Sequence, residues 1–147
     1  MGTVVVGVDG SEGAQEALRF AASEARLRGD RLRVVTVWHV PTIAYSGGLG
    51  PAVGFSEFDE DARARLGAAL EAAGDEVAGL EVERVVREGQ PALELVEEAR
   101  DADLLVVGSR GHGGFVGLLL GSVGQQCAQH APCPVVIVHK HGGSARS

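Results

Sequence analysis

The fold is decided by the stretch Thr3-Val-Val-Val-Gly-Val-Asp-Gly-Ser11, where a run of β-branched residues passes directly into a turn. Because no polar residues alternate with the valines, this run predicts a strand that is covered on both faces, as in a parallel sheet. Asp9 and Gly10 are typical turn residues, and Ser11 is a typical N-cap. Alanines and one leucine then recur at helical spacing up to Gly29. The stretch therefore predicts a strand, a turn and a helix in immediate succession.

The same alternation continues along the chain. Further strands are predicted at 32–40, 81–87, 104–107 and 135–138, and further helices at 55–77, 91–99 and 123–130. The helix at 91–99 carries Leu93, Val96 and Ala99 at helical spacing, and charged residues in the strand at 81–87 indicate an exposed edge. This order predicts an α/β fold with a parallel sheet, right-handed crossovers and helices on both faces. Ligands bind such sheets at the carboxyl ends of strands where the winding reverses, which selects the loops after the strands at 3–8, 32–40 and 104–107.

The composition excludes several classes of protein. The chain has 147 residues and is 45% hydrophobic, which is typical of one domain with a buried core. Its net charge of -7, without a basic cluster, argues against a nucleic-acid partner. Its apolar runs are far shorter than the roughly 20 residues of a membrane span, so we expect no membrane partner. The N-terminus lacks the pattern of a secretory signal, and we expect a cytoplasmic protein.

The two cysteines, Cys127 and Cys133, have neither CxxC spacing nor clustered histidines beside them. A disulfide framework and a structural zinc site therefore have little support, and two free thiols are expected. The sole lysine is Lys140, near the end of the chain.

A glycine-rich segment follows the predicted strand at 104–107. It reads Gly108-Ser-Arg-Gly-His-Gly-Gly-Phe-Val-Gly-Leu-Leu-Leu-Gly-Ser-Val123. Glycines allow positive φ and let backbone N–H groups approach phosphate oxygens. Ser122 and Val123 begin a predicted helix, whose first N–H groups and dipole favour an anion. A P-loop is excluded because there is no GxxxxGK[ST] sequence, and no GxGxxG fingerprint occurs. Taken alone, such a loop is also compatible with a simple mobile connection.

The spacing G-x2-G-x9-G-[ST], formed by Gly108, Gly111, Gly121 and Ser122, resembles the nucleotide-binding signature of the ATP-binding branch of the universal stress proteins. The opening VVVGVDGS and the closing PCPVVIV are similar to the same family, so the likeness covers nearly the whole chain. We therefore expect one doubly wound domain over residues 1–141, with a five-stranded parallel sheet in the order 3-2-1-4-5. Residues 142–147 are expected to be a disordered tail.

The resemblance implies an adenine nucleotide as ligand, ATP or else ADP or AMP, accompanied by Mg2+ or Mn2+. It implies that Asp9 contacts the ribose or supports the metal ion through the nucleotide, and that Val40 meets the adenine ring. For Asp9 alone, a turn or N-cap role is equally compatible with the sequence. Arg110 and His112 are the cationic side chains of the loop. The residues expected at the phosphates are Gly108, Ser109, Arg110, Gly111, Gly121, Ser122 and Val123.

The resemblance points to a stress-response protein that acts through nucleotide occupancy with little or no hydrolysis. Hydrolysis needs a group that orients water and a group that stabilises the transferred phosphoryl. Only Asp9 and Arg110 qualify, and nothing pairs them, so at most a slow ATPase is expected. The alternative is an ATP-dependent hydrolase or transferase with an acceptor site under the loop at 42–54. A structural dimer without a ligand is a third reading. The family likeness also implies a homodimer that pairs through the apolar strand Val135–Val138.

Overall fold

The computed structural model describes residues 1–39, 55–109 and 121–139. In this part of the chain, one five-stranded sheet has the order β3-β2-β1-β4-β5, and all paired strands are parallel. The expected α/β class and strand order are confirmed. The expectations that fall outside the described residues concern Val40, the loop at 42–54, Arg110, Gly111, His112 and the tail at 142–147.

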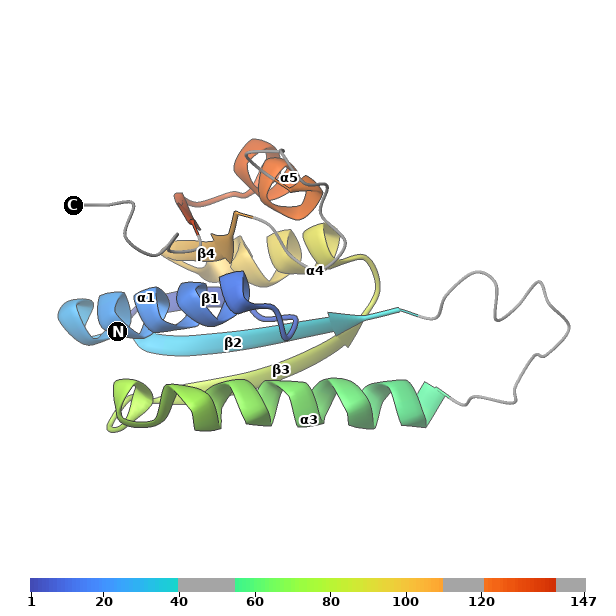
Figure 1. Ribbon diagram of the computed structural model, residues 1–147. Helices are drawn as coiled ribbons and strands as arrows, with labels where there is room; N and C mark the ends of the chain where they lie inside the picture. Colours follow the sequence, from blue (N-terminus) through green and yellow to red (C-terminus); the bar gives the residue numbers. More distant parts are fainter. Residues whose placement is uncertain (40–54, 110–120, 140–147) are drawn as a thin grey trace, which may run out of the picture.

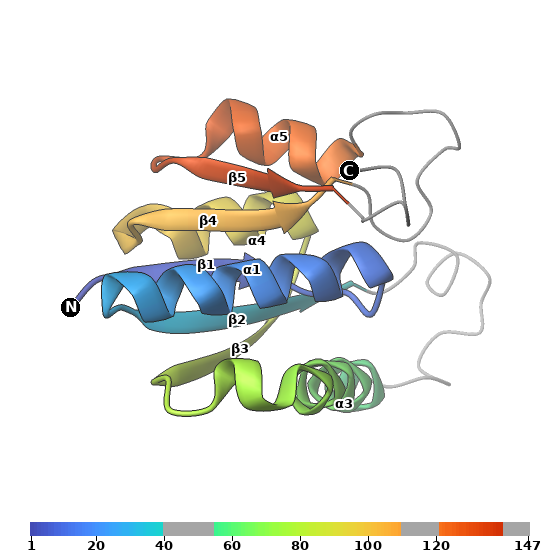
Figure 2. The ribbon, with the colours of Figure 1, turned by 60° about the vertical axis from the view of Figure 1, so that its left-hand side comes forward.

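The strands are β1 (Thr3–Gly7), β2 (Arg31–Trp38), β3 (Val82–Glu88), β4 (Leu104–Gly108) and β5 (Val135–Val138). The helices are α1 (Glu12–Arg28), α3 (Phe55–Ala73), α4 (Pro91–Glu98) and α5 (Ser122–His130), with short 3-10 helices η2 (Gly74–Val77) and η3 (Ala99–Asp101). Helices α1 and α3 cover one face of the sheet, and α4 and α5 cover the other (Figures 1 and 2). No helix in the described ranges is long and apolar enough to span a membrane.

Helix α1 begins and ends where the sequence predicts. The Ser11 side chain accepts a hydrogen bond from the Ala14 N–H (3.1 Å), which satisfies one of the open donors of the first turn. The helix ends at Gly29, which takes φ 71° and donates its N–H to the carbonyls of Ala25 and Arg26. The N-cap role expected for Ser11 is therefore confirmed.

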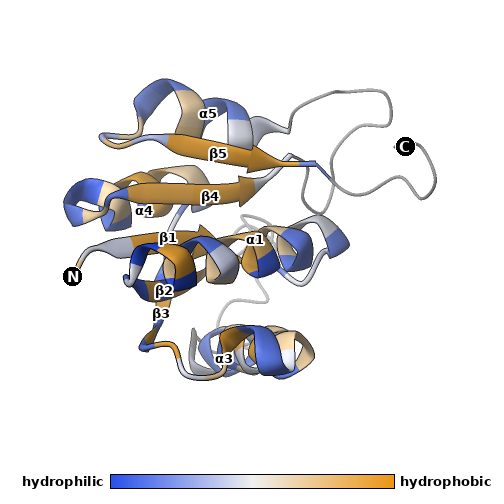
Figure 3. Cartoon of the chain, turned by 90° about the vertical axis from the view of Figure 1, so that its left-hand side faces the viewer, coloured by the Kyte–Doolittle hydropathy of each residue, from blue (hydrophilic) through white to orange (hydrophobic). Residues whose placement is uncertain are grey.

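The central strand β1 is buried on both faces. Val4 and Val6 pack into the hydrophobic layer under α1 and α3, whereas Val5 packs into the layer under α4 and α5. All three side chains are fully buried. Figure 3 shows β1, β4 and β5 as hydrophobic strands, which is the composition of a doubly covered parallel sheet.

Helix α4 turns two of its three expected apolar positions toward the core, because Ala99 is fully buried and Val96 packs against the core, but Leu93 is not part of the buried face. Ala92 and Leu95 are buried, whereas Leu93 is 62% exposed. The reason lies in β1, where a Cβ on Gly7 would come within 2.9 Å of Leu95 Cδ1. The missing side chain of Gly7 makes room for Leu95 against the sheet, and this contact orients the helix.

The carboxyl end of β2 is tied to α3. The Trp38 ring stacks on the Phe58 ring, with centroids 5.9 Å apart, and the indole N–H donates to Asp59 Oδ1 (3.2 Å). The Arg63 guanidinium, followed by this indole N–H, holds the pKa of Asp59 below its ordinary value. Trp38 therefore packs against α3 and anchors it beside the edge of the sheet where β2 ends.

Candidate functional site

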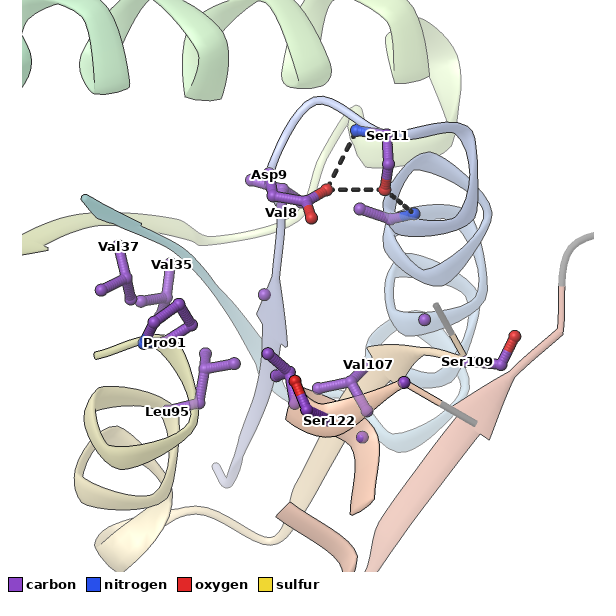
Figure 4. Close-up of a pocket in the computed structure, with 16 residues that line it drawn as sticks. Val8, Asp9, Ser11, Val35, Val37, Pro91, Leu95, Val107, Ser109 and Ser122 are labelled. Carbon is purple, nitrogen blue, oxygen red and sulfur yellow. Dashed lines mark hydrogen bonds between the residues drawn. The ribbon is translucent and has the colours of Figure 1, made fainter. Parts of the chain in front are cut away.

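A pocket of about 210 Å³ lies at the carboxyl ends of β1, β2 and β4 (Figure 4). Strands β1 and β4 are neighbours, and the chain leaves β1 toward α1 on one face and β4 toward α5 on the other. This is the point where the winding of the sheet reverses, and ligands of doubly wound folds bind there. The lining residues come from β1, β2 and β4, from the starts of α1, α4 and α5, and from the turns between them.

One side of the pocket is apolar. Figure 4 shows Val35 and Val37 of β2 beside Pro91 and Leu95 of α4. Val35 and Val37 are two positions apart on a strand, so their side chains share the face that α4 covers. A flat hydrophobic group would be desolvated between this strand and this helix.

The polar side of the pocket begins at the turn between β1 and α1. Asp9 Oδ1 accepts hydrogen bonds from the Ser11 N–H (2.9 Å) and from the Ser11 hydroxyl (2.6 Å). Asp9 thus closes the turn, as one of its two expected roles requires, and it also lines the pocket. Gly10, between them, takes φ 88°.

The two ends of the glycine-rich segment meet at Ser109. The Ser109 carbonyl accepts from the Gly121 N–H (2.6 Å), and the Ser109 N–H donates to the carbonyl of Val138 in β5 (2.9 Å). Ser109 is buried and lines the pocket. The backbone on this side of the pocket is therefore held directly by the edge strand.

The N-terminus of α5 forms the remaining wall. Its first i to i-4 hydrogen bond runs from the Gln125 N–H to the Gly121 carbonyl (3.0 Å), so the N–H groups of Ser122, Val123 and Gly124 precede the helical ladder. All three residues line the pocket, and the first turn of α5 carries no acidic side chain. Such a helix end favours negative charge.

Two of the predicted phosphate-loop glycines do not need positive φ. Gly121 is the N-cap of α5 with φ -74° and ψ 171°, and Gly108 is not among the described glycines that have positive φ. A Cβ on Gly108 would lie 3.0 Å from the carbonyl carbon and oxygen of Gly13. Gly108 is therefore required for the close approach of β4 to the first turn of α1.

The structure brings together every predicted site residue that it describes. The pocket is lined by Asp9, Gly108, Ser109, Gly121, Ser122 and Val123. Sequence reasoning missed the apolar side, although strand alternation would have paired Val35 with Val37, and Pro91 marks the start of the helix that faces them. Cys127 and Cys133 are free thiols, as expected, and burial raises the pKa of Cys127 to about 11.

Comparison with known proteins gives a consistent result. The model of the universal stress protein family matches residues 1–139. A universal stress protein of Mycolicibacterium smegmatis is 40% identical over 139 residues, which are 92% of this chain and 45% of that protein. The chain spans about half the length of the curated mycobacterial relatives that it matches.

Two similar solved structures are complexes with a nucleotide. A universal stress protein in complex with cAMP is 30% identical, with a TM-score of 0.71 and coverage of 95% of this chain and 98% of that chain. The universal stress protein from Archaeoglobus fulgidus in complex with dAMP is 29% identical, with a TM-score of 0.68 and coverage of 94% and 98%.

Proposed function

Since the chain belongs to the universal stress protein family, we propose that its pocket binds an adenine nucleotide, ATP in particular, and that occupancy of the pocket carries a stress-response signal. The observation that carries this proposal is the combination of an apolar side and an anion-favouring helix end in one pocket at the switch point of the sheet. The neighbours that bind cAMP and dAMP support an adenine nucleotide as ligand.

In the proposed complex, the base lies on the apolar side formed by β2 and α4, and the phosphates lie at the start of α5. The Ser122 hydroxyl and the first N–H groups of α5 donate to phosphate oxygens. Asp9 accepts from the ribose or supports a divalent ion through the nucleotide. The described residues hold no group of three His, Cys, Asp or Glu side chains placed for a metal ion, so Mg2+ or Mn2+ would take most ligands from phosphates and water. By the family likeness, Val40, Arg110 and Gly111 complete the site.

We propose that hydrolysis is slow or absent. In the described part of the pocket lining, Asp9 is the one ionisable side chain, and it is engaged by Ser11. Rapid phosphoryl transfer needs a cation beside the transferred group as well as a residue that orients the nucleophile. Because Asp9 Oδ1 already accepts hydrogen bonds from the Ser11 N–H and hydroxyl, this carboxylate is less available to orient a nucleophile, which supports a binding protein over a hydrolase or transferase.

The substitution Asp9→Asn tests the proposal, because an amide oxygen can accept the same two hydrogen bonds from Ser11 while the charge is lost. We expect ATP in the presence of Mg2+ to bind about 5- to 10-fold more weakly, since a charged acceptor is replaced by a neutral one. Titration calorimetry measures the change. Asp30→Asn is the matched control, because Asp30 accepts a hydrogen bond from the Gly2 N–H at the opposite end of the sheet. The Asp30→Asn variant should bind ATP as tightly as the wild type.

Phosphate release from the same samples should be far slower than the ~1 to 100 s⁻¹ typical of kinases. Rapid turnover that Asp9→Asn abolishes would instead establish the hydrolase or transferase alternative. A wild type that binds no adenine nucleotide would refute the proposed function.

We also propose that the protein forms a homodimer through the edge strand β5. The carbonyl of Pro134 accepts a hydrogen bond from Leu105 of β4, and that of Val138 accepts one from Ser109 directly after β4. Alternate residues of a strand turn their polar groups to the same side. Ile137 therefore directs its N–H and C=O away from β4, toward the side of β5 on which the described residues place no further strand. An apolar edge strand with outward donors and acceptors favours pairing with a second copy.

The substitution Ile137→Pro should yield a monomer, because proline removes the outward N–H and its ring occupies the place of the partner strand. Ile137→Ala is the control: it loses the same side chain, which packs against the core, but keeps the N–H, so it should remain dimeric. Light scattering measures the mass of each variant. A monomeric wild type, or a dimeric Ile137→Pro variant, would contradict pairing through β5.

A further inference from the structure

Helix α4 supplies half of the apolar side of the pocket, yet it is short. It spans eight residues, and its N-cap residue Gln90 makes no side-chain capping hydrogen bond. Isolated helices of this length are unstable in water, so contacts with the rest of the fold must hold them in place. Because Pro91 and Leu95 line the pocket, whatever holds α4 also sets the width of the pocket.

Arg87 of β3 binds two carboxylates of α4 at once. Its Nε lies 2.5 Å from Glu94 Oε1, and its Nη1 lies 2.5 Å from Glu98 Oε2. Glu94 and Glu98 are one helical turn apart and therefore project from the same side of the helix. Their side chains are 21% and 14% exposed, whereas that of Arg87 is 37% exposed, so solvent screens these ion pairs in part, though less than pairs on an open surface.

A second arginine fixes the end of the same helix. The buried Arg33 of β2 donates from Nη1 to the backbone carbonyl of Glu98 (2.9 Å) and to Asp101 Oδ1 (2.9 Å). Burial alone would lower the pKa of Arg33, but its hydrogen bonds to Asp101 and Glu83 raise the pKa above the ordinary value. Glu98 thus meets both arginines: its backbone carbonyl accepts from Arg33, and its carboxylate binds Arg87 and also lies 3.6 Å from Arg33 Nη1.

The Arg87 contact lies next to the pocket. Arg87 is the register partner of Val37, so both side chains emerge on the face of the sheet that α4 covers. Glu94 immediately precedes Leu95 in α4. A Cβ on Gly89 would lie 2.5 Å from the Glu94 carboxylate, which shows how closely this carboxylate packs on the turn between β3 and α4.

We infer that Arg87 is a positioning residue for the ligand pocket: by binding Glu94 and Glu98 it holds α4 at the place where Pro91 and Leu95 face Val35 and Val37. This inference rests on the proposed nucleotide binding. It predicts that Arg87 affects the binding of the base, which lies against α4, and not the binding of the phosphates. Arg87 itself is not a lining residue, so it acts through α4.

The test compares Arg87→Gln and Glu94→Gln with the wild type by titration with adenosine and with ATP. Both variants should bind adenosine about 3- to 10-fold more weakly, and ATP should lose the same factor because its phosphates contact α5. Arg28→Gln is the matched control, since it breaks the exposed Arg28–Glu24 pair of α1 and should leave both affinities unchanged. Glu94→Gln removes the Arg87–Glu94 ion pair and keeps the Arg87–Glu98 pair. This variant therefore still tests the proposal if Arg87→Gln fails to fold.

A double-mutant cycle with Leu95→Ala separates positioning from general destabilisation. If Arg87 acts through the α4 wall, Arg87→Gln should weaken adenosine binding much less in the Leu95→Ala background than in the wild type. Additive losses in the cycle, or an unchanged adenosine affinity in both Arg87→Gln and Glu94→Gln, would overturn the role of Arg87 alone. Failure of the wild type to bind adenosine and ATP would overturn the proposed function and this role together.

Discussion

Replacing Gly121 by valine is expected to weaken ATP binding by about 100-fold or more, equivalent to about 2.7 kcal/mol. Gly121 lines the pocket directly before the N–H groups of Ser122 and Val123, so an isopropyl group there would occupy the space of the phosphates. Its φ of -74° and ψ of 171° are open to any residue. The free energy of unfolding should therefore fall by no more than about 1 kcal/mol, through a poorer N-cap. Titration calorimetry and thermal unfolding measure the two effects.

Ser122→Ala is the milder companion of this variant. It removes one hydroxyl donor, and a hydrogen bond to a charged group contributes about 1.5 to 3 kcal/mol, so ATP should bind about one to two orders of magnitude more weakly. Adenosine has no phosphates and should bind Ser122→Ala as it binds the wild type. Unchanged ATP affinity in Gly121→Val would show that the phosphates lie elsewhere in the molecule.

Replacing Gly108 by alanine is expected to lower the free energy of unfolding by roughly 1 to 3 kcal/mol, the typical cost of overpacking. The added Cβ would lie 3.0 Å from Gly13 backbone atoms and 3.3 Å from the Ala14 nitrogen. Backbone atoms in the first turn of α1 cannot rotate away as a flexible side chain can, so the helix must shift away from β4. Chemical denaturation measures the loss of stability.

Gly67→Ala is the matched control, and it is expected to raise the free energy of unfolding instead of lowering it. Gly67 lies within α3, and nothing comes within 4 Å of the position of its added Cβ. Because alanine has a higher helix propensity than glycine, this variant should be about 0.5 to 1 kcal/mol more stable. A Gly108→Ala variant as stable as the wild type would refute the packing role assigned to Gly108.

The sequence by itself determined the fold class. The unbroken valines of β1 leave no polar face, so the strand had to be buried between two layers of helices. The turn Asp9-Gly10-Ser11 contains its own hydrogen-bonding groups, and its cap and its positive φ at Gly10 follow from local chemistry. The anion-favouring start of α5 also follows from local chemistry, because the first N–H groups of any helix have no partner within the helix.

Only the tertiary structure decided which side chains share the pocket. Val35 and Leu95 are 60 positions apart, and no local pattern states that β2 and α4 form one wall. The sequence likewise does not show the role of Gly108, because a glycine in a loop suggests only conformational freedom. In the structure, Gly108 is constrained by the backbone of Gly13 in α1, which leaves little space for a Cβ. Leu93 and Leu95 look alike in the sequence, but Leu95 is buried in the space left by Gly7, whereas Leu93 is exposed. Local chemistry specifies turns, caps and strand type, whereas close packing between distant segments specifies the shape of the site.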